Sequence, residues 1–258
     1  MKFYLGTHVP RWLHYPQFEG VPLFISARRL RDQKRWPRAT TSWAMDSGGF
    51  TELSMYGKWT VSARDYVDDV RRWFDMIGPA DWCAPQDWMC EPVMLQKTGL
   101  SVREHQRLTV ANYLELKSIA PDLPFVPVLQ GWEWCDYMRH VQDYADAGVS
   151  LEQLPTVGVG SVCRRQATGM AEELMRELFR RGINAHGFGF KLEGLAKCAK
   201  YLHSSDSMAW SLQARRGRPM PGCAHGSCNN CARYALHWRQ KALRAAEAGG
   251  GLKQLTLW

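Results

Sequence analysis

Three aspartates lie at the ends or edges of short apolar stretches of the sequence. Asp46 belongs to SWAMDSGGF at residues 42–50, Asp87 ends the segment DWCAPQD, and Asp206 lies just before SMAWS. Two carboxylates in one pocket can act as nucleophile and as general acid or base if their surroundings separate their pKa values. Glycosidic bonds are the usual target of such a pair. Each aspartate taken alone can also be read as a helix N-cap, because Asp is favoured there.

Other polar residues and glycines follow further apolar runs and could form a pocket for a purine base. Asp87 could accept hydrogen bonds from the N–H donors of a guanine-like edge, and Gln130 could donate to its O6. Backbone N–H groups near Gly158 and Gly160 could do the same, since glycine lets the backbone approach a flat ligand. Phe50 could stack on the base. These residues are useful together only if one fold brings the ends of their runs to the same place.

Short apolar runs alternate with amphipathic segments, which is typical of a parallel α/β fold. The eight strand-like runs are residues 2–6, 21–26, 42–47, 81–87, 125–131, 156–161, 184–190 and 207–211. The helix candidates are residues 62–77, 101–119, 134–148, 165–182 and 191–202. Eight strands predict a (β/α)8 TIM barrel, which would gather the polar residues at one mouth. A doubly wound sheet is the alternative, because periodicity does not show that a barrel closes.

The C-terminal segment PGCAHGSCNNCARYALHW, residues 221–238, has the spacing of a zinc site. Its cysteines follow the pattern C-x4-C-x2-C, and thiolate and imidazole ligands at such spacings suit tetrahedral zinc. The predicted ligands are Cys223, His225, Cys228 and Cys231. His225 is preferred to His237 as the fourth ligand because it lies between the cysteines. Four protein ligands leave no open position, so the zinc would be structural.

This zinc segment divides the predicted domains and leaves five other cysteines. Residues 1–212 would form the catalytic barrel, and residues 213–258 a zinc knuckle with a C-terminal helix. The remaining cysteines are expected to be buried thiols: Cys83, Cys90, Cys135, Cys163 and Cys198. With 258 residues, 45% of them apolar, the chain can bury a core without disulfides. No secretory leader or membrane-spanning stretch is evident, so a soluble, cytoplasmic protein is expected.

Basic residues gather in two clusters on a chain with a net charge of +8. The first cluster, in SARRLRDQKRWPRATT, consists of Arg28, Arg29, Arg31, Lys34, Arg35 and Arg38. The second, in QARRGRP, consists of Arg215, Arg216 and Arg218. Such clusters suit phosphate contacts, and Trp36 within the first could stack on a base. A solvated basic loop is the alternative interpretation of either cluster.

The same segments resemble the motifs of the tRNA-guanine transglycosylase superfamily, most closely its shorter DNA-modifying branch found in phages and bacterial genomic islands. MDSGGF at residues 45–50 is similar to the family segment D-S-G-G-[FY]. PQDW at 85–88 resembles a strand end whose Asp binds the purine, and VLQG at 128–131 resembles the family V-Q-G. VGVGS, HGFGF and SSDSMAWS stand in the places of three further motifs. The resemblance covers nearly the whole chain in order.

The resemblance implies roles for individual residues. Asp206 corresponds to the nucleophile, Asp46 to the general acid/base, and His186 stands where the family has a methionine beside the base. The substrate-binding residues would be Ser47, Phe50, Asp87, Gln130, Gly158, Gly160, His186 and Gly187. In the zinc segment, C-x-H-x2-C keeps the spacing of the family's C-x-C-x2-C, and Cys231 would replace a remote histidine.

The activity that the resemblance implies is exchange of guanine in DNA for a 7-deazaguanine, such as the 7-cyano compound, through a covalent nucleotide. DNA is preferred to tRNA because the chain is short and the zinc segment compact, although no residue visibly excludes a 2′-hydroxyl. A duplex must release its target nucleotide, so the expected partners include DNA, the 7-deazaguanine base and proteins that open the duplex. The alternatives are a tRNA-guanine transglycosylase, a non-catalytic zinc-bearing nucleic-acid binding protein and a barrel glycoside hydrolase.

Overall fold

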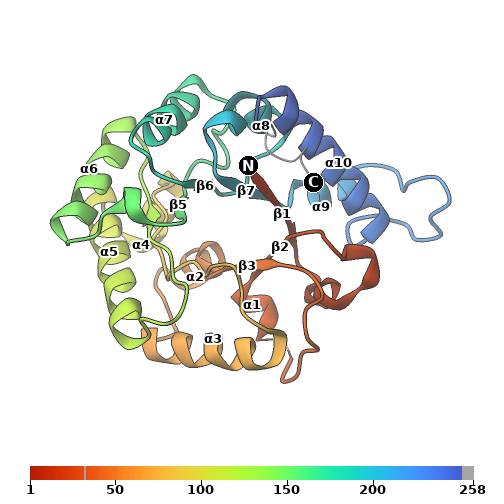
Figure 1. Cartoon of the computed structure of the whole chain (residues 1–258), viewed down its shortest axis with the longest axis horizontal. Helices are drawn as coiled ribbons and strands as arrows, with labels where there is room; N and C mark the ends of the chain where they lie inside the picture. The colour runs from red at the N-terminus through yellow and green to blue at the C-terminus, as the bar shows by residue number, and fades with distance from the viewer. Residues whose placement is uncertain (32, 252–258) are drawn as a thin grey trace.

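The computed structural model describes residues 1–31 and 33–251, and within them seven parallel strands form one sheet in the order β3-β2-β1-β7-β6-β5-β4. The strands are β1 Lys2–Thr7, β2 Leu23–Ser26, β3 Trp43–Asp46, β4 Val128–Leu129, β5 Val157–Val159, β6 Ala185–Gly187 and β7 Ser204–Ser207. The last strand, β7, lies in the middle of the sheet, and the first strand, β1, lies next to it between β2 and β7. Helices surround this central sheet (Figure 1).

The two outer strands of the sheet, β3 and β4, are linked through the segment around Cys83. Cys83 forms single-residue parallel bridges to Met45 of β3 and to Phe125, which lies three residues before β4. Its backbone N–H donates to the carbonyl of Pro124 at 2.9 Å. The run 81–87, predicted as a strand, therefore contributes only this bridged residue. The sheet is curled strongly enough for both of its edges to reach Cys83.

The helices occupy the connections between the strands. The α-helices are α1 Ala27–Leu30, α2 Gly49–Tyr56, α3 Ala63–Ile77, α4 Pro92–Thr98, α5 Val102–Ile119, α6 Trp134–Asp146, α7 Gly169–Arg180, α8 Leu192–Cys198, α9 Ala209–Arg216 and α10 Ala232–Ala248. Short 3₁₀ helices lie at Pro10–His14, Pro16–Phe18, Leu151–Gln153 and Ala199–Tyr201. The five predicted helices are confirmed as α3, α5, α6, α7 and α8. Helix α5, for example, begins with a capping box between Ser101 and Glu104.

The predicted eighth strand, residues 207–211, is wrong. The last strand is the polar sequence SSDS, Ser204–Ser207, and the next residues begin α9. Trp210 is fully buried and its Nε1 donates to the carbonyl of Gly6 at 2.7 Å, so its burial belongs to a helix packed on β1. Because β7 lies between β1 and β6, all four of its residues are buried despite their polarity.

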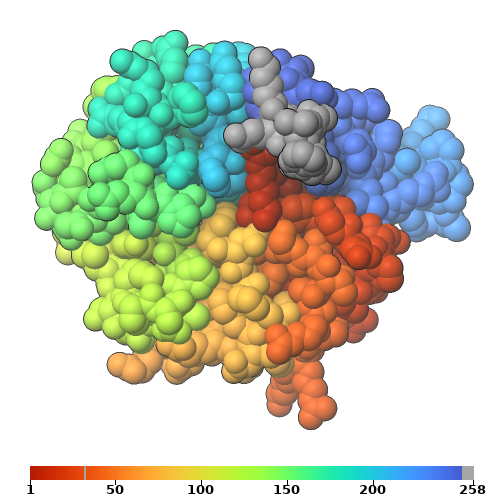
Figure 2. All heavy atoms as spheres, viewed as in Figure 1, coloured from red at the N-terminus to blue at the C-terminus, as the bar shows by residue number. Residues whose placement is uncertain are grey.

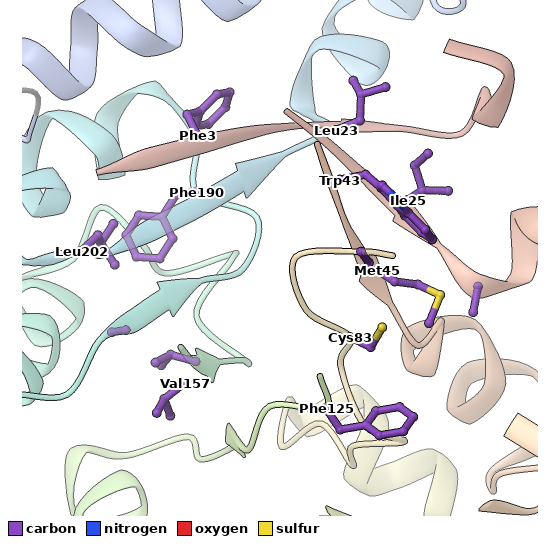
Figure 3. Packing of buried hydrophobic residues seen from close by; sticks show 14 of the residues in the cluster. Phe3, Leu23, Ile25, Trp43, Met45, Cys83, Phe125, Val157, Phe190 and Leu202 are labelled. Carbon is purple, nitrogen blue, oxygen red and sulfur yellow. The ribbon is translucent and has the colours of Figure 1, made fainter. Parts of the chain in front are cut away.

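Alternate strand residues face two different cores. Phe3, Leu23 and Trp43 belong to the large cluster between the sheet and the helices, part of which is drawn in Figure 3. Their neighbours Tyr4 and Phe24 belong to a second, smaller cluster of side chains. This cluster lies on the concave side of the sheet, which it fills with aromatic rings. The alternation has the two-residue period of a strand. Beyond the aromatic rings, the carboxyl ends of the strands on this inner side are free to carry polar groups.

The C-terminal part of the chain closes the ring of helices on one side. Helix α10 packs against α8, and the segment between α9 and α10 projects beside it (Figures 1 and 2). Of the predicted C-terminal unit, residues 252–258 lie outside the described residues. No helix in the described ranges 1–31 and 33–251 has the length and apolar character to cross a membrane.

Candidate active site

A pocket of ≈ 530 Å³ lies where the parallel strands end. Within residues 1–31 and 33–251, four carboxylate side chains line it: Asp46, Asp87, Glu91 and Asp206. Asp46 is the last residue of β3, and Asp206 lies in β7 on the other side of β1 and β2. The volume falls within the range of about 300–1,000 Å³ that is typical of small-molecule sites. The structure therefore brings the three aspartates together at the carboxyl ends of the strands, as the sequence predicts.

Asp206 is held by one of its two carboxylate oxygens. Its Oδ1 accepts a hydrogen bond from the backbone N–H of Gly189 at 2.9 Å and lies 3.4 Å from Nε2 of His186. Within the described residues, both of these contacts are made by Oδ1, so Oδ2 is left for a ligand. Asp206 is 7% exposed and lines the pocket. A carboxylate held in this way suits attack on an electrophilic carbon.

His186 lies beneath Asp206 and does not line the pocket. The ring is fully buried, and its Nδ1 lies 2.9 Å from the hydroxyl of Ser204. Burial lowers the pKa of His186, so the ring is neutral at pH 7 and carries a single N–H. If Ser204 donates to Nδ1, that N–H is on Nε2 and points towards Asp206. The residue predicted to flank the base is thus placed to orient a carboxylate.

Asp46 is followed by a sharp turn in which the position of Gly48 favours glycine. Its Oδ2 accepts from the backbone N–H of Gly48 at 3.0 Å. Gly48 has a φ of +87°, and a Cβ at this position would lie 2.7 Å from Cγ of Arg28. The glycine therefore permits both the left-handed backbone and the close approach of Arg28. This geometry explains the first glycine of the segment MDSGGF.

The environment of Asp46 favours its protonated form. Burial raises the pKa of Asp46 to about 7, and the negative charges of Asp87 and Asp206 add to the rise. Hydrogen bonds from Ser26 and Gly48 oppose it. A carboxyl group with a pKa near 7 exists in both protonation states at neutral pH and can act as acid and as base.

Asp87 is the centre of a buried hydrogen-bond network. Gln130 Nε2 donates to its Oδ2 at 2.5 Å, and Ser47 Oγ donates to its Oδ1 at 3.2 Å. Burial raises the pKa of Asp87 to about 6, although both of these hydrogen bonds lower it. Ser47 and Gln130 are fully buried behind the pocket wall, whereas Asp87 lines the pocket. Of these three predicted base-binding residues, only Asp87 therefore faces a ligand directly.

Two residues that the sequence did not single out as substrate-binding, Ser161 and Glu91, extend this network. Ser161 Oγ accepts from the N–H of Cys90 at 2.8 Å and lies 2.7 Å from Gln130 Oε1 and 2.9 Å from Glu91 Oε2. A serine hydroxyl has one proton, so it can donate to only one of these two acceptors. The network therefore has room for one more donor, supplied by a protonated carboxyl group or by a ligand. Glu91 is only 5% exposed, yet its position before Pro92 makes it look like an ordinary N-cap.

The predicted glycines fall into two groups. Gly160 lines the pocket, next to the amide of Gln130. Gly158 and Gly187 do not line it: a Cβ on Gly158 would lie 2.7 Å from the ring of Phe188, and one on Gly187 would lie 2.6 Å from the ring of Phe190. These two glycines make room for aromatic rings in the cores and do not present their backbone to a ligand.

Phe50 and the first two arginines line the mouth of the pocket. Phe50, at the start of α2, is 49% exposed, as a residue that stacks on a ligand must be. Arg28 and Arg29 line the same pocket. Nη1 of Arg28 is bound by the buried carboxylate of Glu52 at 2.5 Å, which fixes the guanidinium in place.

The rest of the first basic cluster lies elsewhere. Arg31 pairs with Asp69 on α3 at 3.1 Å. Trp36 is buried and donates its Nε1 to the carbonyl of Leu30, so the ring is not available to stack on a base. Lys34, Arg35 and Arg38 are exposed. Arg38 precedes Ala39, whose N–H donates to Ile77 at the end of α3, so the cluster is spread along the side of the molecule.

The second basic cluster is exposed at the end of α9. Arg215 and Arg216 form its last turn, and Arg218 follows. Strand β7 ends at Ser207 and α9 begins at Ala209, three residues after Asp206. The helix therefore leads from the pocket directly to these arginines.

The four predicted zinc ligands are brought together. The ligand atoms of Cys223, His225, Cys228 and Cys231 all lie within 4.8 Å of one another. A tetrahedral zinc ion with bonds of about 2.3 Å to sulfur separates its ligands by about 3.8 Å, so the donor set fits the ion after a small contraction. His237 is exposed on α10 and is not part of this group.

The remaining cysteines are not all buried. Cys83, Cys90 and Cys198 are buried as predicted, but Cys135 is exposed and Cys163 is half-buried in the pocket wall. Cys135 lies in the first turn of α6, whose buried residues follow a helical spacing that leaves it outside.

Comparison with protein families agrees with this geometry. The model of the DpdA family, described as DeoxyPurine in DNA protein A, matches residues 1–258, and the chain belongs to this family. It is a DNA-modifying family related to the tRNA-guanine transglycosylases, so the chain has a role in deazapurine modification of DNA and belongs to a transglycosylase type of enzyme. A search of curated proteins found no match.

Proposed function

We propose that this member of the DpdA family exchanges guanine in DNA for a 7-deazaguanine, such as the 7-cyano compound, by two displacements at C1′ of the target nucleotide. The observation that carries the proposal is the pairing of Asp206 and Asp46 in one pocket with different environments. Among the residues that the structure describes, Asp206 is held through Oδ1, whereas burial raises the pKa of Asp46 to about 7. Such a difference supports separate roles for the two carboxylates, with Asp206 as nucleophile and Asp46 as proton carrier.

In the first displacement, Oδ2 of Asp206 attacks C1′ and the bond from C1′ to N9 of guanine breaks. Guanine leaves with the bonding electron pair, and its ring takes a proton from the protonated carboxyl group of Asp46. In the second, the Asp46 carboxylate removes the N9 proton of the 7-deazaguanine. N9 then forms the new bond to C1′ and Asp206 leaves as a carboxylate. Two inversions retain the configuration at C1′.

The base would be bound between Phe50 and the inner wall of the pocket. Asp87 has the lone pairs to accept from N1–H and the exocyclic amino group of the base. Gln130 is buried behind the pocket wall and already donates to Asp87, so it would keep Asp87 in position for the base. Gly160 would allow close approach of the backbone. Asp87, with a pKa of about 6, is largely ionised at neutral pH and therefore remains an acceptor.

Two features of the architecture belong to the same proposal. The bridges at Cys83 on both sides support a closed (β/α)8 barrel in residues 1–212, with residues 213–258 as the zinc-bearing unit. Cys223, His225, Cys228 and Cys231 would hold a structural zinc ion. Around them, Asn229 accepts from Ser211 of α9 at 2.9 Å, and Asn230 hydrogen-bonds to His8 in the pocket wall. The ion would brace α9, with its arginines, against the barrel.

The test is incorporation of radiolabelled guanine and of labelled 7-cyano-7-deazaguanine into DNA and tRNA side by side. We expect incorporation into DNA, and its loss in Asp206→Asn, which should still bind DNA. The matched control is Asp68→Asn, which changes an exposed aspartate of α3. Incorporation into tRNA alone would indicate the tRNA-modifying alternative. Full activity of Asp206→Asn would refute the covalent mechanism, and DNA binding without exchange by the wild type would support a binding role.

A further inference from the structure

Large apolar side chains are exposed on both sides of the pocket mouth. Phe50 is 49% exposed on one side, and Met208, directly after β7, is 45% exposed on the other. Both line the pocket. Leu212, one turn further along α9, is 49% exposed. Together these three side chains place apolar surface next to the carboxylates of the pocket, where an apolar partner could bind.

The exposed face of α9 changes from apolar to basic along its length. Met208, Leu212 and Arg215 or Arg216 follow one another at helical spacing, so they lie on one face. At 1.5 Å per residue, Met208 and Arg216 are separated by about 12 Å along the axis. A DNA strand advances about 3.4 Å per nucleotide, so this face spans about three to four nucleotide steps. Its apolar end lies at the pocket, and its cationic end lies where strand phosphates would pass.

We propose that α9 opens the duplex: Met208 and Leu212 enter the base stack in place of the extruded nucleotide, while Arg215 and Arg216 bind phosphates of the same strand. The inference rests on the proposed exchange reaction, because it concerns how the target guanine reaches the pocket. Proteins that unstack DNA commonly insert Met, Leu, Ile or Phe between base steps, and the wider contact offsets the cost of unstacking.

The opposite face of α9 supplies the rigidity that a wedge needs. Trp210 and Ala214 are fully buried, and Nε1 of Trp210 donates a hydrogen bond to the carbonyl of Gly6 in β1 at 2.7 Å. Ser211 donates to Asn229 in the zinc segment at 2.9 Å. Met208 and Leu212 are therefore presented by a helix fixed on two sides. Phe50, across the mouth, remains free to stack on the base inside the pocket.

DNA is a better occupant of this face than a protein would be. A protein partner of the apolar residues would have to be acidic next to them to match Arg215, Arg216 and Arg218. DNA provides both requirements at once, since its bases are apolar on their faces and its phosphates are anionic. The family's action on DNA places the same polymer at the adjacent pocket.

The experiment measures initial rates of base incorporation into native plasmid DNA and into the same DNA after heat denaturation, with the base that the wild type incorporates best. The readout is the ratio of the native to the denatured rate for the full-length, zinc-loaded protein. We expect Met208→Ala and Leu212→Ala to lower this ratio roughly tenfold or more, which corresponds to about 1.4 kcal/mol of lost opening energy. The matched control is Leu114→Ala, which removes a leucine that is 38% exposed on α5 and should leave the ratio unchanged.

The outcomes separate the wedge from the reaction itself. Equal loss on native and denatured DNA would show that Met208 and Leu212 serve the pocket alone, and would refute the wedge while leaving the exchange reaction standing. Incorporation by the wild type into denatured DNA only would also refute it, because another protein would then have to open the duplex. A wild type that labels neither form refutes the proposed function, and the wedge fails with it.

Discussion

Replacing Asp46 by Asn should remove activity and at the same time stabilise the protein at alkaline pH. Burial and two neighbouring carboxylates raise the pKa of Asp46 from 3.8 to about 7. At about 1.36 kcal/mol per pKa unit, this rise corresponds to about 4 kcal/mol. The amide oxygen of the substituted side chain can still accept from Gly48, so the turn is kept.

The sign of the effect follows from proton binding. Between pH 3.8 and about 7 the folded protein holds a proton on Asp46 that the unfolded chain has lost, so the stability of the wild type falls as the pH rises. Below pH 3.8 both states are protonated and the full stability is present. Above pH 7 the loss is complete. Asp46→Asn does not titrate and lacks this loss.

The measurement is the free energy of unfolding by urea for the wild type and Asp46→Asn at pH 4, 6 and 8. The stability difference between the variant and the wild type should grow by about 4 kcal/mol across this range. The control, Asp68→Asn, changes an exposed aspartate and should follow the wild type at every pH. A constant difference between wild type and Asp46→Asn would contradict the assigned environment, whatever happens to activity. Unchanged exchange by Asp46→Asn would separately refute its role as proton carrier.

Three further predictions concern the frame of the site. Removal of zinc with a chelator should lower Tm and the exchange rate together, as metal analysis and thermal melting of the same samples would show; a metal-free, fully stable protein would contradict the structural zinc. Gly158→Ala should destabilise by about 1–3 kcal/mol in urea unfolding because its Cβ meets the ring of Phe188, whereas Gly169→Ala, with open space around it, should be neutral. Arg28→Ala should cost about 1–3 kcal/mol because Glu52 would be buried without its partner, and Glu52→Gln in the same background should recover part of that loss.

The meeting of Asp46, Asp87 and Asp206 in one pocket was predictable because the carboxyl ends of parallel strands lie at one side of a sheet. Asp46 and Asp87 each follow a buried, largely apolar stretch, and this pattern can be recognised from the sequence alone. The helices were equally clear, since α3 and α5 carry Ser caps and apolar residues at helical spacing. The grouping of Cys223, His225, Cys228 and Cys231 was predictable because all four lie within nine residues of sequence, which keeps them close together in the folded protein.

Features that depend on neighbours across the fold could not be predicted in this way. Strand β7 is polar and has no apolar alternation, because its burial comes from β1 and β6 on either side. Trp36 lies among arginines in sequence but is buried in space. Glu91 and Ser161 are 70 residues apart in the sequence, and their hydrogen bond forms only when the chain folds.

A metal ion held by Cys223, His225, Cys228 and Cys231 would have a structural role next to the pocket. Helix α9 has eight residues, and a helix of that length is unstable without tertiary support. On one side Trp210 anchors it to β1, and on the other Ser211 binds Asn229 between two of the metal ligands. The next residue, Asn230, hydrogen-bonds to His8 in the pocket wall. A metal that fixes this segment therefore fixes both α9 and the side of the pocket next to Asp206, so loss of the ion should reach the reacting centre and not the C-terminal region alone.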